Sequence, residues 1–254
     1  MSDETNATGI ESAKKDKRNR TGQRKPGKRY TASKTKVPAT PVPLAAALEI
    51  VKGFDAAKFD QSIELIFNLG IDTRQADQQV RGSISLPNGI GKTKRVIAFV
   101  DDTKRAEALE AGAMMAGGED MVNEIRSSGF SDFDVAVAEP GMMRFVGTLG
   151  QTLGPKGLMP SPKAGTVTPD PITAIKEYAA GKLEYRADKG GNIHTVIGRA
   201  SFDTPKLVEN AEAMIAEIQG RKPESSKGIY MKKAVLKATM TPSVELQMSA
   251  PAAG

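Results

Sequence analysis

The pattern of apolar residues changes twice along this chain, and each change marks a different kind of strand. Ser62–Leu69 alternates polar and apolar residues, which is typical of a strand with one buried face. From about residue 90 to residue 181, continuous apolar runs such as Arg95–Val100 alternate with helical patterns, which indicates βαβ units around a parallel sheet. Alternating strands return at Leu183–Ala187 and Ile193–Gly198. The chain therefore predicts an α+β domain built from both ends and interrupted by an inserted α/β domain.

The domain limits follow from these changes. The first domain is expected to comprise residues 37–89 and 182–254, and the inserted domain residues 90–181. Helices are predicted over Leu44–Gly53, Gly141–Leu149 and Thr204–Gly220. The chain would pass between the domains near Asn88–Gly91 and again near Gly181, and the glycines at both crossings suit a hinge.

Residues 1–36 carry most of the positive charge. They contain 11 Lys and Arg against four Asp and Glu, whereas the whole chain has 36 basic and 30 acidic residues. The rest of the chain is therefore close to neutral. So few apolar residues predict a disordered basic extension, which is either a solubilising tail or an arm that binds phosphates.

The composition excludes several classes of site. There is no cysteine, and His194 is the single histidine, so neither a thiol nucleophile nor a zinc site is expected, and no cofactor is predicted. No apolar run reaches the roughly 20 residues that cross a bilayer, so no membrane partner is expected. Aromatic residues make up 5% of the chain, which disfavours base stacking as the main binding mode.

Enzyme motifs fail when their spacing is tested. Asn88–Thr93 ends like a phosphate-binding P-loop, but that motif needs a glycine where the chain has Leu86. No Gly-x-Gly-x-x-Gly follows a predicted strand. The acidic pairs Asp101–Asp102 and Glu119–Asp120 stand at predicted helix starts, where carboxylates favour the helix dipole. A nucleotide-dependent enzyme on the α/β domain is thus the weaker alternative.

Gly150–Thr168 is too rich in glycine and proline to be one helix or one strand. A loop of this length inside a compact domain tends to be functional or disordered. Its cations Lys156 and Lys163 are spaced for one edge of the loop. They are possible RNA contacts or supports for the interdomain geometry.

The segment Leu153–Thr168 closely resembles a signature of the ribosomal protein L1 family, bacterial type, and the similarity runs from about Lys28 to Glu245. Further motifs carry it, in chain order: Ala57–Asp60, Leu69–Asp72, Asp77–Gly82, Leu86–Gly89, Gly91–Lys92, Ala111–Gly112, Gly117–Glu119, Asp188–Lys189, Ile193–His194, Gly198–Phe202, Lys222–Pro223, Lys227–Gly228 and Thr239–Met240. Two departures are Thr241, where the family commonly has Gly, and Ser161, where it usually has Asn.

The resemblance implies a discontinuous first domain and an inserted, Rossmann-like second domain without a nucleotide. It also implies a non-enzymatic, cytoplasmic constituent of the large ribosomal subunit. Such a protein binds large-subunit rRNA at the mobile stalk and aids movement and release of deacylated tRNA from the exit site. Bacterial members also repress translation of their own messenger RNA. A third reading, nonspecific nucleic-acid binding by the tail, stays open.

The resemblance further implies an RNA-binding face on the first domain: Lys58, Phe59, Ser62, His194, Arg199, Ser201, Thr239, Met240 and Ser243. Cations would contact phosphate and hydroxyls the 2′-OH, while Phe59 and Met240 would pack against sugar or base. From the sequence alone, a core position is favoured for Phe59 and similarly for Met240. From the sequence alone, His194 in its alternating strand is more typical of a side chain paired within the protein than of an RNA contact. Arg199 is most typical of a solvated surface cation.

Overall fold

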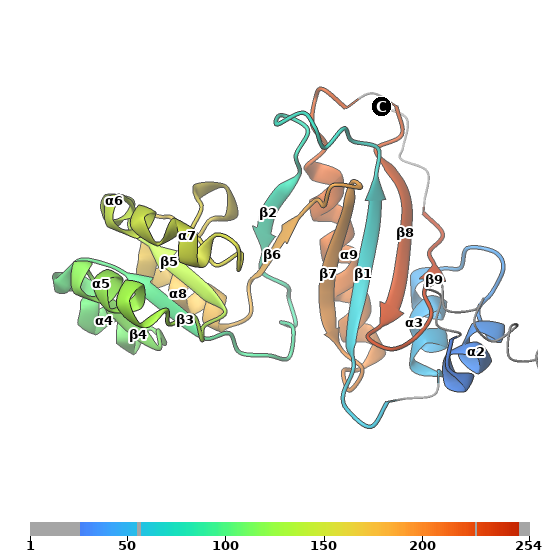
Figure 1. Ribbon diagram of the computed structural model, residues 1–254. Coiled ribbons are helices and arrows are strands. Elements are labelled where there is room, and N and C mark those ends of the chain that lie inside the picture. The colour runs from blue at the N-terminus through green and yellow to red at the C-terminus, as the bar shows by residue number, and fades with distance from the viewer. Residues whose placement is uncertain (1–25, 55–56, 227, 249–254) are drawn as a thin grey trace, which may run out of the picture.

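The computed structural model describes residues 26–54, 57–226 and 228–248. Its larger sheet is antiparallel and has strand order β7-β1-β8-β9. The strands come from both ends of the chain: β1 (Ser62–Leu69), β7 (Asn192–Arg199), β8 (Met231–Ala238) and β9 (Val244–Glu245). Helices α3 (Leu44–Lys52) and α9 (Thr204–Gly220) pack on one face of this sheet (Figure 1). We call this unit the antiparallel lobe.

Alternation of residues builds the core of the antiparallel lobe. Every second residue of β1 is buried, starting at Ile63, and these side chains meet the apolar stripe of α9. That stripe includes Leu207, Ala211, Met214 and Ile218, which are fully buried. Residues spaced by three or four positions share one face of a helix, so the stripe closes over the sheet. The strand and helix expected here are confirmed.

Lys28–Thr35 forms helix α2, so the prediction of disorder is wrong for this part of the extension. An isolated helix of eight residues is only marginally stable in water, so its contacts with the lobe hold it. Ser33 is buried, and Val37 just beyond the helix packs against the core. The low apolar content of this segment led to the wrong prediction, because one buried residue and one residue packed on the core accompany an ordered helix here. Residues 1–25 lie outside the described residues.

A three-stranded parallel sheet with order β4-β3-β5 forms the centre of a second unit, the parallel lobe (Figure 1). Its strands are β3 (Val96–Phe99), β4 (Met115–Gly117) and β5 (Val135–Ala138). All residues of β3 and β5 are buried because helices pack on both faces. One face is covered by α5 (Glu119–Ser128) and residues 142–153, and the other by α4 (Arg105–Glu110) and α8 (Pro171–Ala179).

The single helix predicted over Gly141–Leu149 is wrong in form. The chain instead makes a series of short turns: η3 (Pro140–Met142), α6 (Met143–Val146), η4 (Gly147–Leu149) and α7 (Gly150–Leu153). Glycine is a poor helix former, and Gly147 and Gly150 begin two of these pieces. Beyond them, the glycine–proline loop is ordered, with a further turn η5 (Pro162–Ala164) and buried Leu153 and Ala164.

A two-stranded antiparallel sheet of β2 (Arg81–Ile84) and β6 (Leu183–Arg186) lies between the lobes (Figure 1). Beside it, the fully buried Asn210 of α9 holds the first crossing. Its Oδ1 accepts from the Asn88 amide at 3.0 Å, and its Nδ2 donates to the Gly89 carbonyl at 2.9 Å and to the Ile197 carbonyl at 2.8 Å. Asn88 and Gly89 are thus fastened to the antiparallel lobe.

The η5 turn abuts the same two-stranded sheet. A Cβ on Gly165, whose φ is +75°, would lie 3.2 Å from the Ser83 Oγ of β2. The Tyr178 hydroxyl donates to the Ala164 carbonyl at 2.8 Å, and burial raises the pKa of Tyr178 to about 12. The hydroxyl therefore remains a donor at neutral pH. Within the described ranges, no helix is long and apolar enough to cross a membrane, and no cluster of three metal-ligating side chains occurs.

Candidate nucleic-acid interface

Three chain segments meet at one end of the antiparallel sheet, the lower end in Figure 1. They are the turn before β1, the end of β7 and the connection from β8 to β9, and Ser62 pairs with Arg199 in the strand register. They bring together most of the predicted RNA-binding residues: Lys58, Phe59, Ser62, Arg199, Ser201, Thr239, Met240 and Ser243. We call this set the sheet-end surface.

Asp60 ties the first two segments together. Its carboxylate accepts both hydrogen bonds that Ser201 offers, from the amide at 3.1 Å and from the hydroxyl at 2.9 Å. The Asp60 carbonyl accepts from an Arg199 guanidinium nitrogen at 3.2 Å. The turn that carries Lys58 and Phe59 is therefore fastened to the end of β7.

Gln61 and Thr239 tie in the third segment. The Gln61 side chain is buried, and its Oε1 accepts from the Met240 amide at 3.1 Å. Thr239 Oγ1 accepts from the Ser62 amide at 3.1 Å, and the Thr239 amide donates to the Ser62 carbonyl at the same distance. The β8–β9 connection is thus positioned by contacts across almost 180 residues of sequence.

The two large apolar side chains of the sheet-end surface face solvent. Phe59 is 54% exposed and Met240 is 55% exposed, so the core position that the sequence also allowed for them is wrong. Both belong to segments that the hydrogen bonds of Asp60 and Gln61 fix at the same end of the sheet. Both suit packing on a ribose or a base.

The cations of the sheet-end surface are available to a ligand. Within residues 26–54, 57–226 and 228–248, the ion pairs closer than 4 Å include neither Lys58 nor Arg199. Asp60 is the neighbouring acid, and its oxygens already accept hydrogen bonds from Ser201. The surface therefore combines two cations, several hydroxyls and two apolar side chains on a fixed backbone.

His194 lies apart from this surface. It stands in the middle of β7 opposite Ile66, five residues before Arg199, which is about 16 Å along an extended strand. Its side chain is exposed on the face without helices, and its Nε2 lies 3.8 Å from an Asp188 carboxylate oxygen. An RNA that touched both ends would have to follow β7.

Lys156 and Lys163 belong to the parallel lobe. Lys156 contacts the Ser131 hydroxyl through its ammonium group, and Lys163 is exposed in η5. Because η5 abuts β2, this part of the loop lies at the junction of the lobes. Neither lysine adjoins the sheet-end surface.

Thr241, which replaces a glycine common in the family, turns inward. Only 9% of the residue is exposed, and its hydroxyl accepts from the Ala238 amide at 2.9 Å. The extra side chain therefore closes the β8–β9 turn instead of obstructing its outer side.

Sequence reasoning missed Asp60 and Gln61 as organisers of the site. Asp60 was visible within the motif Ala57–Asp60, but its partners are distant in sequence.

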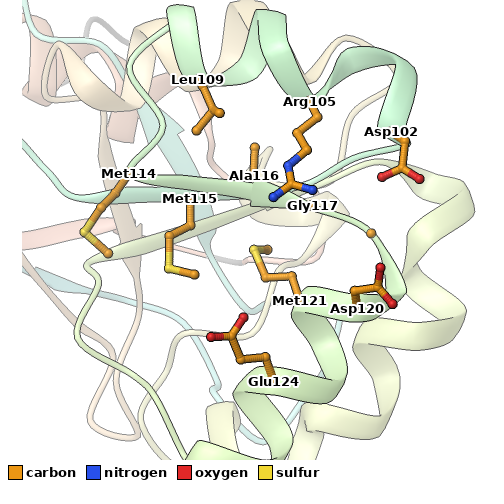
Figure 2. Close-up of a pocket in the computed structure, with 11 residues that line it drawn as sticks. Asp102, Arg105, Leu109, Met114, Met115, Ala116, Gly117, Asp120, Met121 and Glu124 are labelled. Carbon is orange, nitrogen blue, oxygen red and sulfur yellow. The ribbon is translucent and has the colours of Figure 1, made fainter.

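The parallel lobe exposes a contrasting surface, which we call the acidic edge: Asp101, Asp102, Glu119 and Asp120. A pocket beside it is shown in Figure 2, where Arg105 from α4 faces Asp120 and Glu124 from α5. Three methionines and Leu109 complete much of the lining. Carboxylates repel the phosphates of a nucleotide, so this pocket gives no support to the enzyme alternative.

Comparison with known proteins identifies the relatives of this chain. Residues 51–242 match the family described as the ribosomal protein L1p/L10e family. The chain belongs to this family. Curated relatives named large ribosomal subunit protein uL1 include that of Solibacter usitatus, 48% identical over 88% of this chain and 94% of its own length. Those of Methylobacillus flagellatus and a Polaromonas species are 49% and 53% identical, over 87% and 78% of this chain and 96% and 85% of theirs.

Family membership confirms the resemblance inferred from the motifs. The L1 family consists of ribosomal proteins, and the chain is accordingly a structural protein and not an enzyme. The alternative of a nucleotide-dependent enzyme is therefore set aside.

Proposed function

We propose that this protein is a cytoplasmic constituent of the large ribosomal subunit that holds the rRNA of the mobile stalk on its sheet-end surface. The observation that carries the proposal is the outward exposure of Phe59 and Met240 on the surface of Lys58 and Arg199, neither of which forms an ion pair with a described residue. Family membership supports the ribosomal role. The hydrogen bonds of Asp60 and Gln61 support a preformed site that needs little reordering on binding.

The chemistry of the surface suits folded RNA better than bulk electrostatic attraction. Beyond residue 36 the chain has slightly more acidic than basic residues, so its overall field does not attract polyanions. Lys58 and Arg199 would bind phosphates, and the hydroxyls of Ser201 and Ser243 would reach 2′-hydroxyls. Phe59 and Met240 would pack on unstacked sugars or bases. Recognition would then depend on RNA shape.

The remaining parts of the role rest on the family. We propose that residues 37–89 and 182–254 form the RNA-bound domain and residues 90–181 a Rossmann-like domain that follows the stalk. Movement about the crossings would aid release of deacylated tRNA from the exit site. The same surface would bind a similar structure in the protein's own messenger RNA and repress its translation. Because Asn210 hydrogen-bonds to residues 88 and 89, a hinge at this crossing would lie after Gly89 in the chain.

Footprinting of large-subunit rRNA with a protein lacking residues 1–25 tests this proposal. This deletion leaves α2 intact. We expect specific protection of the stalk rRNA with a modest loss of affinity and a shallower dependence on salt, because the tail contributes only phosphate contacts. Protection that vanished with the tail, or that spread evenly over the rRNA, would instead favour nonspecific binding by the extension.

A further inference from the structure

A hollow joins helix α2 to the sheet-end surface. Met240 forms one side of it, and the other side is made by five consecutive residues at the start of the helix: Pro26, Gly27, Lys28, Arg29 and Tyr30. These residues precede Met240 by more than 200 positions, so only the fold brings them together. The hollow is thus continuous with the surface proposed to bind RNA.

Helix α2 adds positive charge where the sheet-end surface has little. The residues of that surface include two cations, Lys58 and Arg199, and the Asp60 carboxylate lies beside them. Lys28 and Arg29 add two cations beside Met240, and α2 itself contains no acidic residue. In the part of the chain that the structure describes, neither cation lies in an ion pair closer than 4 Å.

The hollow also has an apolar floor. Tyr30 is 39% exposed and Met240 is 55% exposed. An aromatic ring and a thioether flanked by two cations match a nucleotide, whose base or sugar offers a flat apolar face and whose phosphates offer charge. An acidic peptide would satisfy the cations but leave the exposed ring without a specific partner. Ser33 of α2 is buried and Val37 just beyond the helix packs against the core, so the cations and the ring stand at defined positions.

We propose that α2 extends the rRNA-binding surface: Lys28 and Arg29 bind phosphates of the RNA strand whose sugar or base packs between Tyr30 and Met240. This inference rests on the function proposed above, since it names further contacts of the same RNA. The inference gives residues 26–30 a role in RNA recognition and makes no use of residues 1–25.

The test compares two double substitutions that remove equal charge from the same helix. Lys28→Ala with Arg29→Ala removes the cations beside Met240. Lys34→Ala with Lys36→Ala removes two exposed cations from the other end of α2. Binding of the full chain to a transcript of the stalk rRNA is measured by fluorescence anisotropy at several salt concentrations, and circular dichroism checks that each variant is folded.

We expect the first pair to weaken binding at least tenfold and to lower the slope of log K against log salt by about two, which corresponds to two phosphate contacts. The second pair is expected to change affinity less than threefold. Tyr30→Leu should weaken binding severalfold, whereas Tyr30→Phe, which keeps the ring, should retain it.

Each failure has its own signature. Equal losses for the two pairs would overturn the inference, because charge in general and not position would then matter. The same conclusion would follow if Lys28→Ala with Arg29→Ala bound like the wild type. If the unaltered chain showed no preference for stalk rRNA, the proposed function itself would fall before any variant was compared.

Discussion

The sheet-end surface and the acidic edge both form where strands of a sheet end, yet they expose opposite chemistry. At the sheet end, the Asp60 carboxylate accepts two hydrogen bonds from Ser201, and neither Lys58 nor Arg199 forms an ion pair closer than 4 Å with a described residue. At the acidic edge, carboxylates such as Asp102 and Glu119 stand in the first turns of helices, where they favour the helix dipole. The comparison teaches that the part of the chain beyond residue 36, which is close to neutral overall, can still present a local basic surface by distributing its charges.

Apolar exposure allows the sharpest test, because each lobe exposes large apolar side chains in its own site. Phe59→Ala with Met240→Ala should lower affinity for stalk rRNA about 100-fold, since each packed base is worth about 1–3 kcal/mol. The melting temperature should hardly change, because more than half of each side chain is already exposed. Anisotropy titration and thermal unfolding measure the two effects.

The matched control for this pair lies in the pocket of the parallel lobe. Leu109 and Met114 are 46% and 42% exposed, so Leu109→Ala with Met114→Ala removes similar exposed apolar surface. We expect rRNA affinity to stay within twofold of the wild type. A comparable loss from both pairs would mean that RNA does not distinguish the two lobes.

Gln61 should produce a smaller effect without touching RNA. It is 4% exposed, and Gln61→Leu removes the acceptor that holds the Met240 amide. The β8–β9 connection would then lose its fixed position, and we expect about a tenfold loss of rRNA affinity, in line with about 1–1.5 kcal/mol for one hydrogen bond. Gln61→Glu keeps an acceptor and should bind RNA more tightly than Gln61→Leu. If the two variants bound equally, the hydrogen bond would not position the site.

The sequence was sufficient where local periodicity decides the structure. The predicted bounds of α9, Thr204–Gly220, are those observed, because a long apolar stripe follows a proline and precedes a glycine. It was insufficient where a few distant contacts decide. Helix α2 is followed by Val37, which packs against the core of the antiparallel lobe, and nothing in the composition of the helix indicates that contact.

The candidate site shows the same division. The family resemblance pointed to residues in three segments, and the fold brings these segments to one end of a sheet. The predicted strand Ile193–Gly198 already separates His194 from Arg199 by five residues, but the sequence does not show that Arg199 lies opposite Ser62 and His194 opposite Ile66. Nor could it reveal that Gln61 reaches the Met240 amide across 179 positions. The partners of these residues depend on the register of strands that are far apart in the chain.

The smallest effect is expected from reversing charge at the acidic edge. Asp102→Lys with Asp120→Lys places cations around the pocket in which Arg105 already lies. We expect about a threefold gain in binding of an unrelated RNA duplex at low salt, lost at higher salt, because exposed phosphate contacts are screened. Affinity for stalk rRNA should not change, since these residues are remote from the sheet end. Filter binding of both RNAs at two salt concentrations measures this.

A second charge reversal in the parallel lobe distinguishes the effect of the position of the charges from the effect of the net charge of the protein. Glu107→Lys with Glu110→Lys makes the same change in charge on exposed positions of α4 outside the pocket lining. If this pair raised duplex binding as much as the first, the acidic edge would matter only as part of the total charge. If the first pair bound stalk rRNA more tightly and selectively than the wild type, shape at the sheet end would no longer explain specificity. The contrast between the lobes would then be one of charge alone.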